Sequence, residues 1–404
     1  MAFLQGLRTF LCNFALVKRF WLSLLLIVSM SGKAQTDTVS IDTTNTQRSG
    51  VMQPVYWILD YLSKTNKPTN KAFDGSFVVG PSYNNTSSFG IGGAYSGIYK
   101  WDPTDSLLMA SNVSLFFNAS IKGFFQIGLR GNNFMPNDRQ RWNYKLTAQS
   151  LPLNFWGIGY ESANLNENKG KYHELKLHFK FDYLFRIARN LYVGPMTDLN
   201  YSHNYHFDSD ETLGRIQGQD KNIFSAGAGV IMQYDSRDFI LNAYRGNFIR
   251  LEQLFFPKFL NTYYFNRTEM TYDAYRRVWK RCILALDLHS QLNYGGTVPW
   301  TMLALVGDES CRMRGYYEGR YRDRNIIEGQ LELRQSLPYR LGVVLFAGCA
   351  NSFHDFDSIE WRHTLPNYGV GFRWEFKPRV NFRIDVGMTN KFKPGVCVNM
   401  NEAF

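Results

Sequence analysis

The sequence has few of the features that would place it among helical membrane proteins. Its N-terminal apolar run, residues 20–30, is too short to cross about 30 Å of hydrocarbon comfortably as a helix. The mean hydropathy of −0.30 is low for a bundle of membrane helices. An aromatic content of 16% is high for a disordered chain. Neither class fits the composition.

Cysteine is also scarce, with five residues in 404. Cys282, Cys311, Cys349 and Cys397 lie far apart and lack the close spacing of metal sites. Export would permit disulfides, but nothing in the sequence pairs these residues. We expect free thiols and no metal site.

Catalytic patterns are missing as well. His173 and His178 are five residues apart in a strand-like segment, so they point to opposite sides, whereas zinc proteases need two histidines on one helix face. The glycine-rich residues 89–97 are not followed by a helix, which argues against a nucleotide site. His289 and Ser290 are adjacent in a predicted strand and face opposite ways. The sequence therefore predicts no catalytic residues, no cofactor and no enzyme activity.

The N-terminus resembles a secretory signal. Arg8, Lys18 and Arg19 flank the apolar run, and Gly32 and Ala34 are the small residues that a signal peptidase reads. The alternative is a membrane-anchoring helix. We expect residues 1–34 to be a signal peptide, residues 35–74 a short periplasmic segment that is partly disordered, and residues 75–404 a single barrel domain.

The positive charge does not indicate nucleic acid. Residues 1–34 contain four Lys/Arg and no acid, so the remaining chain carries +11 − 4 = +7. The cations are spread along alternating segments, with no basic tail or recognition-helix pattern. We expect no nucleic-acid partner.

Long alternating segments dominate the rest of the sequence. In residues 171–185, Leu175, Leu177 and Phe179 share one parity, while Lys176 and Lys180 share the other. A soluble sandwich also alternates, but these segments are longer than typical soluble strands, and the aromatic load suits a barrel with interfacial girdles. The pattern predicts an all-β transmembrane barrel of about sixteen antiparallel strands. The expected strands are 75–82, 88–100, 106–118, 122–131, 140–148, 173–185, 190–203, 222–235, 246–255, 263–275, 281–292, 326–336, 341–350, 366–376, 380–388 and 395–404.

With this count, short turns fall at one end of the barrel and long polar loops at the other. Residues 101–105, 186–189, 276–280, 337–340 and 377–379 are the short turns, which we assign to the periplasmic side. Residues 151–170, 204–221, 295–325 and 351–365 are the long loops, which we place outside.

Two segments stand out between the strands. Residues 307–325, here called the arginine segment, are rich in arginine, glycine and tyrosine and have no period, so they form a long loop. Arg314 could leave water only by pairing with carboxylates, and Glu332 faces inward on the next strand, with Glu375 and Asp385 farther round the wall. The alternative is a solvated external loop rich in arginine. The other segment is a charged periplasmic turn, which comprises Asp235, Arg237 and Asp238, followed by Gly246. Its plainer interpretation is a solvated turn.

Together, these residues resemble the C-terminal barrel of the bacterial surface-antigen superfamily, which includes the assembly factors BamA and TamA. The resemblance rests on residues 306–307, 314–316, 319–325 and 332–334, and in order on residues 155–159, 227–229, 235–238 and the final Phe404. It implies a sixteen-stranded barrel with the loop folded into its lumen. It also implies a lock in which Arg314, Gly315 and Tyr316 reach inward and Arg314 meets Glu332. In the family's Phe-x-Asp-x-Gly pattern on the next strand, Gly348 stands at the place of a usual second acid and Ala350 at that of the glycine, so the resemblance implies a looser lock.

The resemblance departs from the assembly factors at the N-terminus. Those proteins carry periplasmic POTRA domains, but residues 35–74 are mostly polar and near the lower size limit for a folded domain. We expect a barrel without POTRA domains.

The resemblance implies a factor of outer-membrane biogenesis in a Gram-negative bacterium, either an insertase-like barrel or a subunit of a protein assembly or export complex. The alternative is a passive pore or a structural surface barrel. Expected partners are outer-membrane lipids and lipopolysaccharide, with other outer-membrane assembly or export proteins. We expect a weak lateral seam because the first strand is short and followed by Gly, Asn and Ser. The predicted seam residues are Phe77, Val79, Val396, Val398, Met400 and Phe404.

Overall fold

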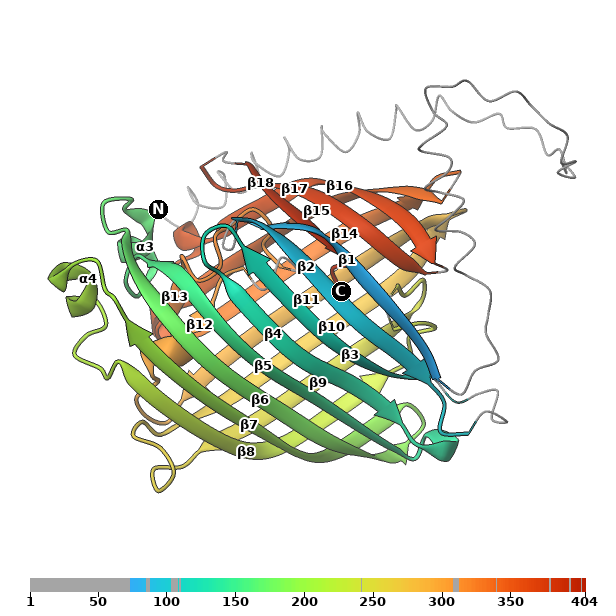
Figure 1. Cartoon of the computed structure of the whole chain (residues 1–404), viewed down its shortest axis with the longest axis horizontal. Helices are drawn as coiled ribbons and strands as arrows, with labels where there is room; N and C mark the ends of the chain where they lie inside the picture. The colour runs from blue at the N-terminus through green and yellow to red at the C-terminus, as the bar shows by residue number, and fades with distance from the viewer. Residues whose placement is uncertain are drawn as a thin grey trace, which may run out of the picture. The chain divides into compact units, whose positions relative to one another are not determined.

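The computed structural model describes residues 73–84, 88–102, 108, 110–240, 242–307, 312–338, 340–377, 379–391, 394–400 and 402–404. Within these residues, sixteen antiparallel strands form one closed barrel (Figure 1). Neighbours in sequence are neighbours in the wall, except that β11 pairs with β14 and β1 closes the ring against β18. The all-β barrel that the alternation predicts is confirmed. The predicted signal peptide and the segment that follows it lie outside the described residues, apart from residues 73 and 74.

The wall consists of long strands, and from β5 to β8 and from β10 to β17 short and long connections alternate, whereas residues 85–87 and 121–124 are short connections at the long-loop end. The strands are β1 (Phe73–Asn84), β2 (Ser88–Tyr99), β3 (Ser111–Ser120), β4 (Phe125–Phe134), β5 (Gln140–Phe155), β6 (Gly170–Ala188), β7 (Leu191–Tyr205), β8 (Asn222–Asp235), β9 (Gly246–Phe256), β10 (Phe265–Trp279), β11 (Cys282–Tyr294), β14 (Asn325–Ser336), β15 (Leu341–Phe353), β16 (Leu365–Lys377), β17 (Val380–Met388) and β18 (Pro394–Met400).

Short elements occupy the connections. They are α3 (Tyr160–Asn164), α4 (Asp210–Gly214), the 3-10 turns η1 (Pro136–Asp138), η2 (Trp300–Met302), η3 (Phe356–Ser358) and η4 (Trp361–His363), and the pair β12 (Ala304–Leu305) and β13 (Arg322–Asp323). In the part of the chain that is described, no helix is long and apolar enough to cross a membrane.

The barrel is apolar outside and charged inside. On β6, the outward-facing Leu175 and Leu177 are almost half exposed, whereas Asp182 points inward and is buried. On β17, the inward positions Arg383 and Asp385 are buried. Because lipid would solvate the exposed apolar face and would not solvate charges, this arrangement suits a barrel surrounded by hydrocarbon.

Several boundary predictions are wrong by two residues or more, and three of these differences affect the seam and the lumen. β1 is not short, because it pairs with β2 along its whole length from Phe73 to Asn84. β5 does not stop near residue 148, because residues 149–155 pair with β6 from Gly170 onward. β18 ends at Met400 rather than at residue 404. In β18, even-numbered residues share the outward face of Ile384 on β17, so a longer strand would point the Glu402 carboxylate towards lipid.

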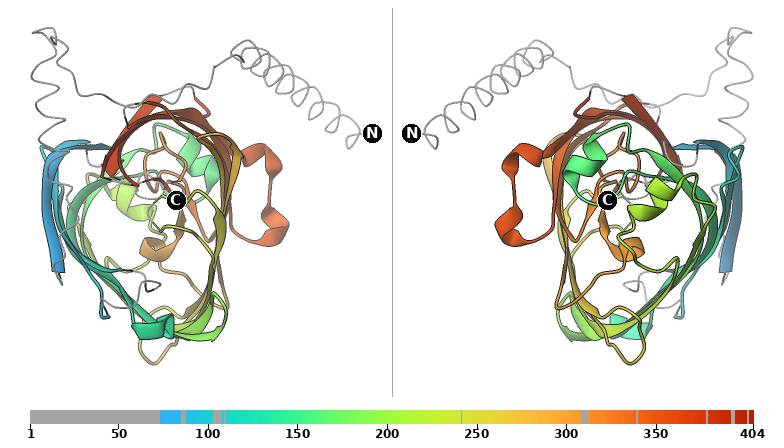
Figure 2. Two further views of the ribbon diagram at one scale, coloured as in Figure 1. Left: turned by 90° about the vertical axis from the view of Figure 1, so that its right-hand side faces the viewer. Right: turned by 90° about the vertical axis from the view of Figure 1, so that its left-hand side faces the viewer.

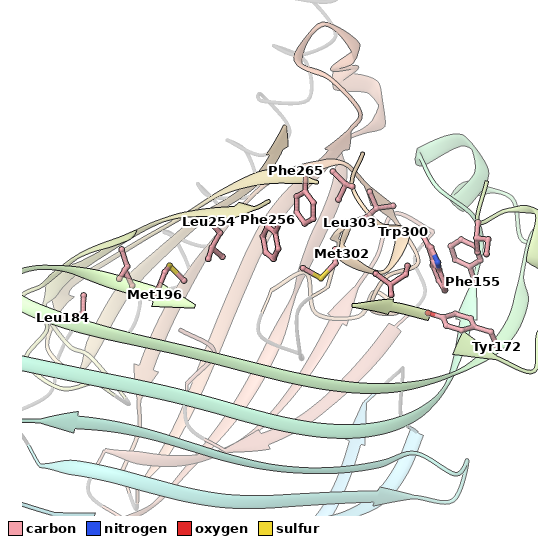
Figure 3. Packing of buried hydrophobic residues seen from close by; sticks show 14 of the residues in the cluster. Phe155, Tyr172, Leu184, Met196, Leu254, Phe256, Phe265, Trp300, Met302 and Leu303 are labelled. Carbon is pink, nitrogen blue, oxygen red and sulfur yellow. The ribbon is translucent and has the colours of Figure 1, made fainter. Parts of the chain in front are cut away.

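The segment between β11 and β14 packs into the barrel through an apolar cluster (Figure 3). Trp300, Met302 and Leu303 from this segment meet Phe155 of β5 and Tyr172 of β6, and the Trp300 ring lies 5.4 Å from that of Phe155. Farther along the segment, β12 and β13 form a small hairpin. The segment is thus partly structured, although its sequence shows no period.

Candidate functional site

The centre of the candidate site is Arg314 in the arginine segment. Its side chain is fully buried inside the ring of strands, where Figure 2 shows loop segments in orange. Arg314 Nη2 lies 2.5 Å from Glu332 Oε1 on β14, and Nη1 lies 3.0 Å from Asp385 Oδ2 on β17. The guanidinium also stacks 3.6 Å from the centre of the Phe346 ring on β15. One side chain therefore joins the loop to three wall strands.

Arg314 belongs to a larger network of buried charges. Arg334 Nε donates to Glu332 Oε2 at 2.7 Å, and Arg373 Nη1 donates to Asp385 Oδ1 at 2.5 Å. The members are four cations and three carboxylates, so the charges nearly cancel, as buried charges must. They are Arg314, Arg334, Arg373 and Arg383 with Glu332, Asp385 and Glu402.

Two glycines let the loop backbone approach the wall. Gly315 has a φ of +105°, and a Cβ there would lie 2.6 Å from the carbonyl oxygen of Gly387 on β17. A Cβ on Gly387 would lie 2.0 Å from the carbonyl oxygen of Arg314. Both positions need glycine because a Cβ would collide with the facing backbone. Gly315 also needs glycine for its positive φ.

Tyr316, the next residue of the loop, is held in place by two hydrogen bonds of its hydroxyl group. Its hydroxyl donates to the carbonyl oxygen of Pro366 at 2.8 Å and accepts from the backbone N–H of Asn390 at 3.0 Å. Arg312, just before the lock, makes a bidentate pair with Asp287 of β11, with distances of 2.8 and 3.0 Å. The structure thus brings together all four residues that the resemblance assigned to the lock.

A second carboxylate does reach Arg314, although not from the strand on which the resemblance places it. Gly348 does stand where a second acid was expected, on the inward face of β15. The second carboxylate comes instead from Asp385, two strands farther round the wall. Asp385 is buried on the inward face of β17, and its carboxylate reaches the same guanidinium.

The charged turn is only partly solvated, because Asp235 is buried while Asp238 is exposed. Asp235 is buried and accepts from Arg237 at 2.9 and 3.0 Å, while the Arg237 guanidinium stacks 4.1 Å from the Phe248 ring. Gly246 has a φ of +113°, and a Cβ there would lie 2.3 Å from the carbonyl oxygen of Ser236. The chain therefore turns tightly where β9 begins.

The same connection reaches across the short-turn end of the barrel. Residues 236–245, here called the rim strap, have residue 241 outside the described set. Asp238 accepts from Arg379 Nη2 of the β16–β17 turn at 2.8 Å and from the backbone N–H of Tyr244 at 2.9 Å. Partial burial opposes ionisation, but these hydrogen bonds outweigh it and hold the pKa of Asp238 below its ordinary value. The ionised carboxylate fastens the rim strap to the opposite turn.

The seam between β1 and β18 is the weakest part of the wall. Among the described residues, the two strands oppose each other at one pair, Tyr83 and Val398, whereas β17 and β18 pair along the whole of β18. Phe77 and Val79 lie on β1 beyond the end of β18 and are exposed, and Val396 and Val398 lie on β18 itself. Met400 is the last residue of β18, and its side chain lies outside the described set.

Phe404 is not part of the seam, contrary to the sequence prediction. Residues 402–404, here called the tail, turn into the lumen, and Phe404 packs against Tyr275 and Ile283. Arg334 Nη2 donates to the Phe404 carbonyl oxygen at 3.0 Å. Inside the barrel Glu402 lies 2.8 Å from Arg373 and 3.9 Å from Arg334, whereas an extended β18 would turn its carboxylate towards lipid.

Sequence reasoning paired Arg314 with Glu332 and named Asp385 as an inward carboxylate farther round the wall, but it did not pair Asp385 with Arg314 and did not assign Phe346 or Arg373 to the lock. Alternation places all three on inward faces, so parity could have identified them as lumen residues. Parity cannot say which inward residues from separate strands converge on one guanidinium, because this depends on the curvature of the wall.

Comparisons with known proteins agree with this architecture. A family model described as the Omp85 superfamily domain matches residues 109–398. The solved structure of BamA from Haemophilus ducreyi lacking POTRA domains 1–3 is 12% identical, with a TM-score of 0.50, and covers 88% of this chain and 79% of that chain. No curated protein sequence matches.

Two CdiB structures are also similar. CdiB from Acinetobacter baumannii is 9% identical, and CdiB from Escherichia coli is 14% identical, each with a TM-score of 0.52. Both alignments cover 83% of this chain, but only 60% and 62% of the respective CdiB chains. This chain therefore spans less than two thirds of either CdiB. Because the sequence identities are below 25%, these structural similarities show a shared fold alone.

The first prediction concerns the charges of the lock. Arg314→Ala leaves Glu332 and Asp385 without their loop cation, and Glu332→Ala leaves Arg314 short of a carboxylate. Each change should lower the free energy of unfolding by about 3 kcal/mol or more, because a buried charge loses its partner. The measurement is the temperature at which the folded band disappears on a gel run without boiling.

Arg362→Ala is the matched control, because Arg362 pairs with Glu360 on an exposed loop and its side chain is 75% exposed. Its melting midpoint, the temperature at which half of the folded band is lost on the gel, should equal that of the native protein within experimental error. Equal midpoints for all three variants and the native protein would show that the lock does not stabilise the barrel.

The second prediction concerns backbone contact at the lock. Gly387→Ala places a methyl group against the Arg314 carbonyl and should lower the same midpoint without changing any charge, because the loop must move away from β17. Gly214→Ala is the control, since a Cβ there meets nothing within 4 Å. If both variants melt alike, the close contact has no energetic importance.

Proposed function

Because this chain belongs to the Omp85 superfamily of Gram-negative outer-membrane β-barrels, we propose that it is an outer-membrane biogenesis factor. It acts either as an insertase-like barrel or as a subunit of a protein assembly or export complex. Such a role needs a wall that can open sideways and a lumen that stays closed. It needs no catalytic group.

The seam is the observation that carries this proposal. Along β1, the residues from Phe73 to Val79 project past the end of β18, so the backbone groups on that edge have no strand beside them among the described residues. Unpaired backbone groups are costly in hydrocarbon and provide a template for another strand. A polypeptide entering from the periplasm could pair with this edge by strand addition.

The filled lumen supports an insertion or export role over free diffusion. The arginine segment ties the wall on one side through Arg312 and Asp287, and on the other through Arg314 and Asp385. The apolar cluster around Trp300 anchors the start of the same connection. A passive pore remains the alternative, and its specific support is the charged lining, which includes Lys180, Arg250 and Glu252.

The third prediction concerns the lateral opening. In a background with the native cysteines replaced by alanine, Tyr83→Cys with Val398→Cys places thiols at the opposed pair of the seam. Oxidation should abolish assistance to an unfolded outer-membrane barrel in proteoliposomes, because the wall cannot open. The rate at which that barrel gains its heat-resistant form measures this assistance, and a reductant should restore it.

The control pair is Ile384→Cys with Val398→Cys, which joins β17 to β18 at a position that is already paired. Oxidation of this pair should leave the rate unchanged. Undiminished assistance from the oxidised seam variant would rule out lateral opening.

The fourth prediction separates a plugged barrel from a pore. In planar bilayers, the native protein should show small, flickering openings, and Arg314→Ala should show larger ones, because the loop loses its hold on β14 and β17. Arg362→Ala should behave as the native protein does. Large, steady openings in the native protein would favour the passive pore.

A further inference from the structure

The tail lies in a built receptor at the short-turn end of the lumen. Glu402 Oε2 accepts from Arg373 Nε at 2.8 Å, and Glu402 Oε1 accepts from Asn381 Nδ2 at 2.5 Å. Arg373 and Asn381 are each more than nine-tenths buried. The receptor thus presents two buried donors to one carboxylate, which charge-assisted bonding favours.

An aromatic pocket receives the last residue of the tail. The Phe404 ring lies 6.2 Å from the Tyr275 ring and 4.8 Å from the Arg334 guanidinium. Ala243, Ile283 and Ala285 complete the apolar surround. Glu402 and Phe404 are thus two residues apart along the tail. Different groups of the receptor bind the acidic and the aromatic side chain.

The site does not close over the tail completely. A small pocket of about 40 Å³ adjoins Glu402 and extends towards the turn between β14 and β15. Arg334, Arg373 and Asn381 line it together with Tyr244 of the rim strap. Within the part of the chain that the structure describes, buried Arg373 Nη2 and Arg334 Nη1 have no hydrogen-bond partner. The site therefore has donor groups and space that the tail does not use.

The tail also has an alternative position, as a continuation of β18 alongside β1. The register of Tyr83 with Val398 would align residue 402 with Val79 and residue 404 with Phe77 if β18 continued. Both β1 residues are exposed at present, at 49% and 65%. The tail can therefore leave the receptor and extend β18, at the cost of moving the Glu402 carboxylate to the outer face of the wall.

From this geometry we propose that the receptor is an exchangeable peptide-binding site. Its occupant in this structure is the tail, and it accepts from a second polypeptide an extended segment with an acidic residue two positions before an aromatic one. The Asp238–Arg379 pair holds the rim strap over the entrance and controls exchange. This inference goes beyond the proposed role, because it concerns a binding equilibrium that exists whether or not the barrel assists insertion.

The tail competes with any incoming peptide because it is covalently attached. A tethered ligand acts at an effective concentration in the millimolar range, so it masks the site from dilute peptide. Weakening the tail should therefore tighten the apparent binding of free peptide by roughly tenfold or more.

The experiment uses the full-length protein in detergent micelles and a fluorescent heptapeptide with the sequence of residues 398–404, Val-Asn-Met-Asn-Glu-Ala-Phe. Fluorescence anisotropy measures binding to the native protein and to Glu402→Gln with Phe404→Ala. Binding should be at least about tenfold tighter to the double variant. A control peptide with Gln for Glu and Ala for Phe should not bind. Retention of the heat-resistant band shows that the variant is folded.

A second variant leaves the tail and its receptor intact. Arg379→Ala frees the rim strap from the opposite turn and should speed peptide association several-fold relative to the native protein. Asn381→Ala in the double variant removes one donor to the peptide acid and should weaken binding several-fold.

The location of the bound peptide is a further test. A peptide with photoreactive benzoylphenylalanine in place of Phe should cross-link to the region around Tyr275, Ile283 or Arg334. Adducts confined to β1, equal affinity of the native and double-variant proteins, or equal binding of the control peptide would each overturn the proposal.

Discussion

The burial of one guanidinium constrains much of this barrel. Arg314 is removed from water, so its charge requires carboxylates at hydrogen-bonding distance. Glu332 and Asp385 supply them from β14 and β17, and the Phe346 ring covers the remaining face. Because these groups stand on separate strands, the loop cannot sit deep in the lumen unless the wall has this curvature. The position of the loop therefore depends on the shape of this side of the wall, which places both carboxylates around Arg314.

The lock is connected to the weakest part of the wall through side chains. Glu332 contacts Arg334, which holds the Phe404 carbonyl, and Asp385 contacts Arg373, which holds Glu402. The tail follows directly after β18, which forms one edge of the seam. A change in the lock can therefore reach the seam through two short chains of buried ion pairs. The network offers a physical route between a plugged lumen and an opening wall.

The short-turn end of the barrel holds a second set of contacts, which connects the rim strap to the tail. The rim strap crosses to the β16–β17 turn through Asp238 and Arg379, and its Ala243 packs in the cluster that receives Phe404. The Asp238 carboxylate is only partly shielded, and its hydrogen bonds favour the ionised form. The buried lock and the more accessible rim contact therefore differ in how easily they break.

Residue alternation by itself determined which residues face the lumen and the approximate strand number, and the length of the segments together with the aromatic content identified the class as a membrane barrel, because a lipid-exposed wall requires apolar side chains at every second position. The resemblance added the pairing of Arg314 with Glu332. Only the tertiary structure decided that Asp385 replaces the acid missing at Gly348, that the rim strap crosses to Arg379, and that Phe404 lies inside the lumen. These contacts join residues far apart in sequence, and they depend on wall curvature and on where Glu402 finds cations. No local pattern encodes these distances.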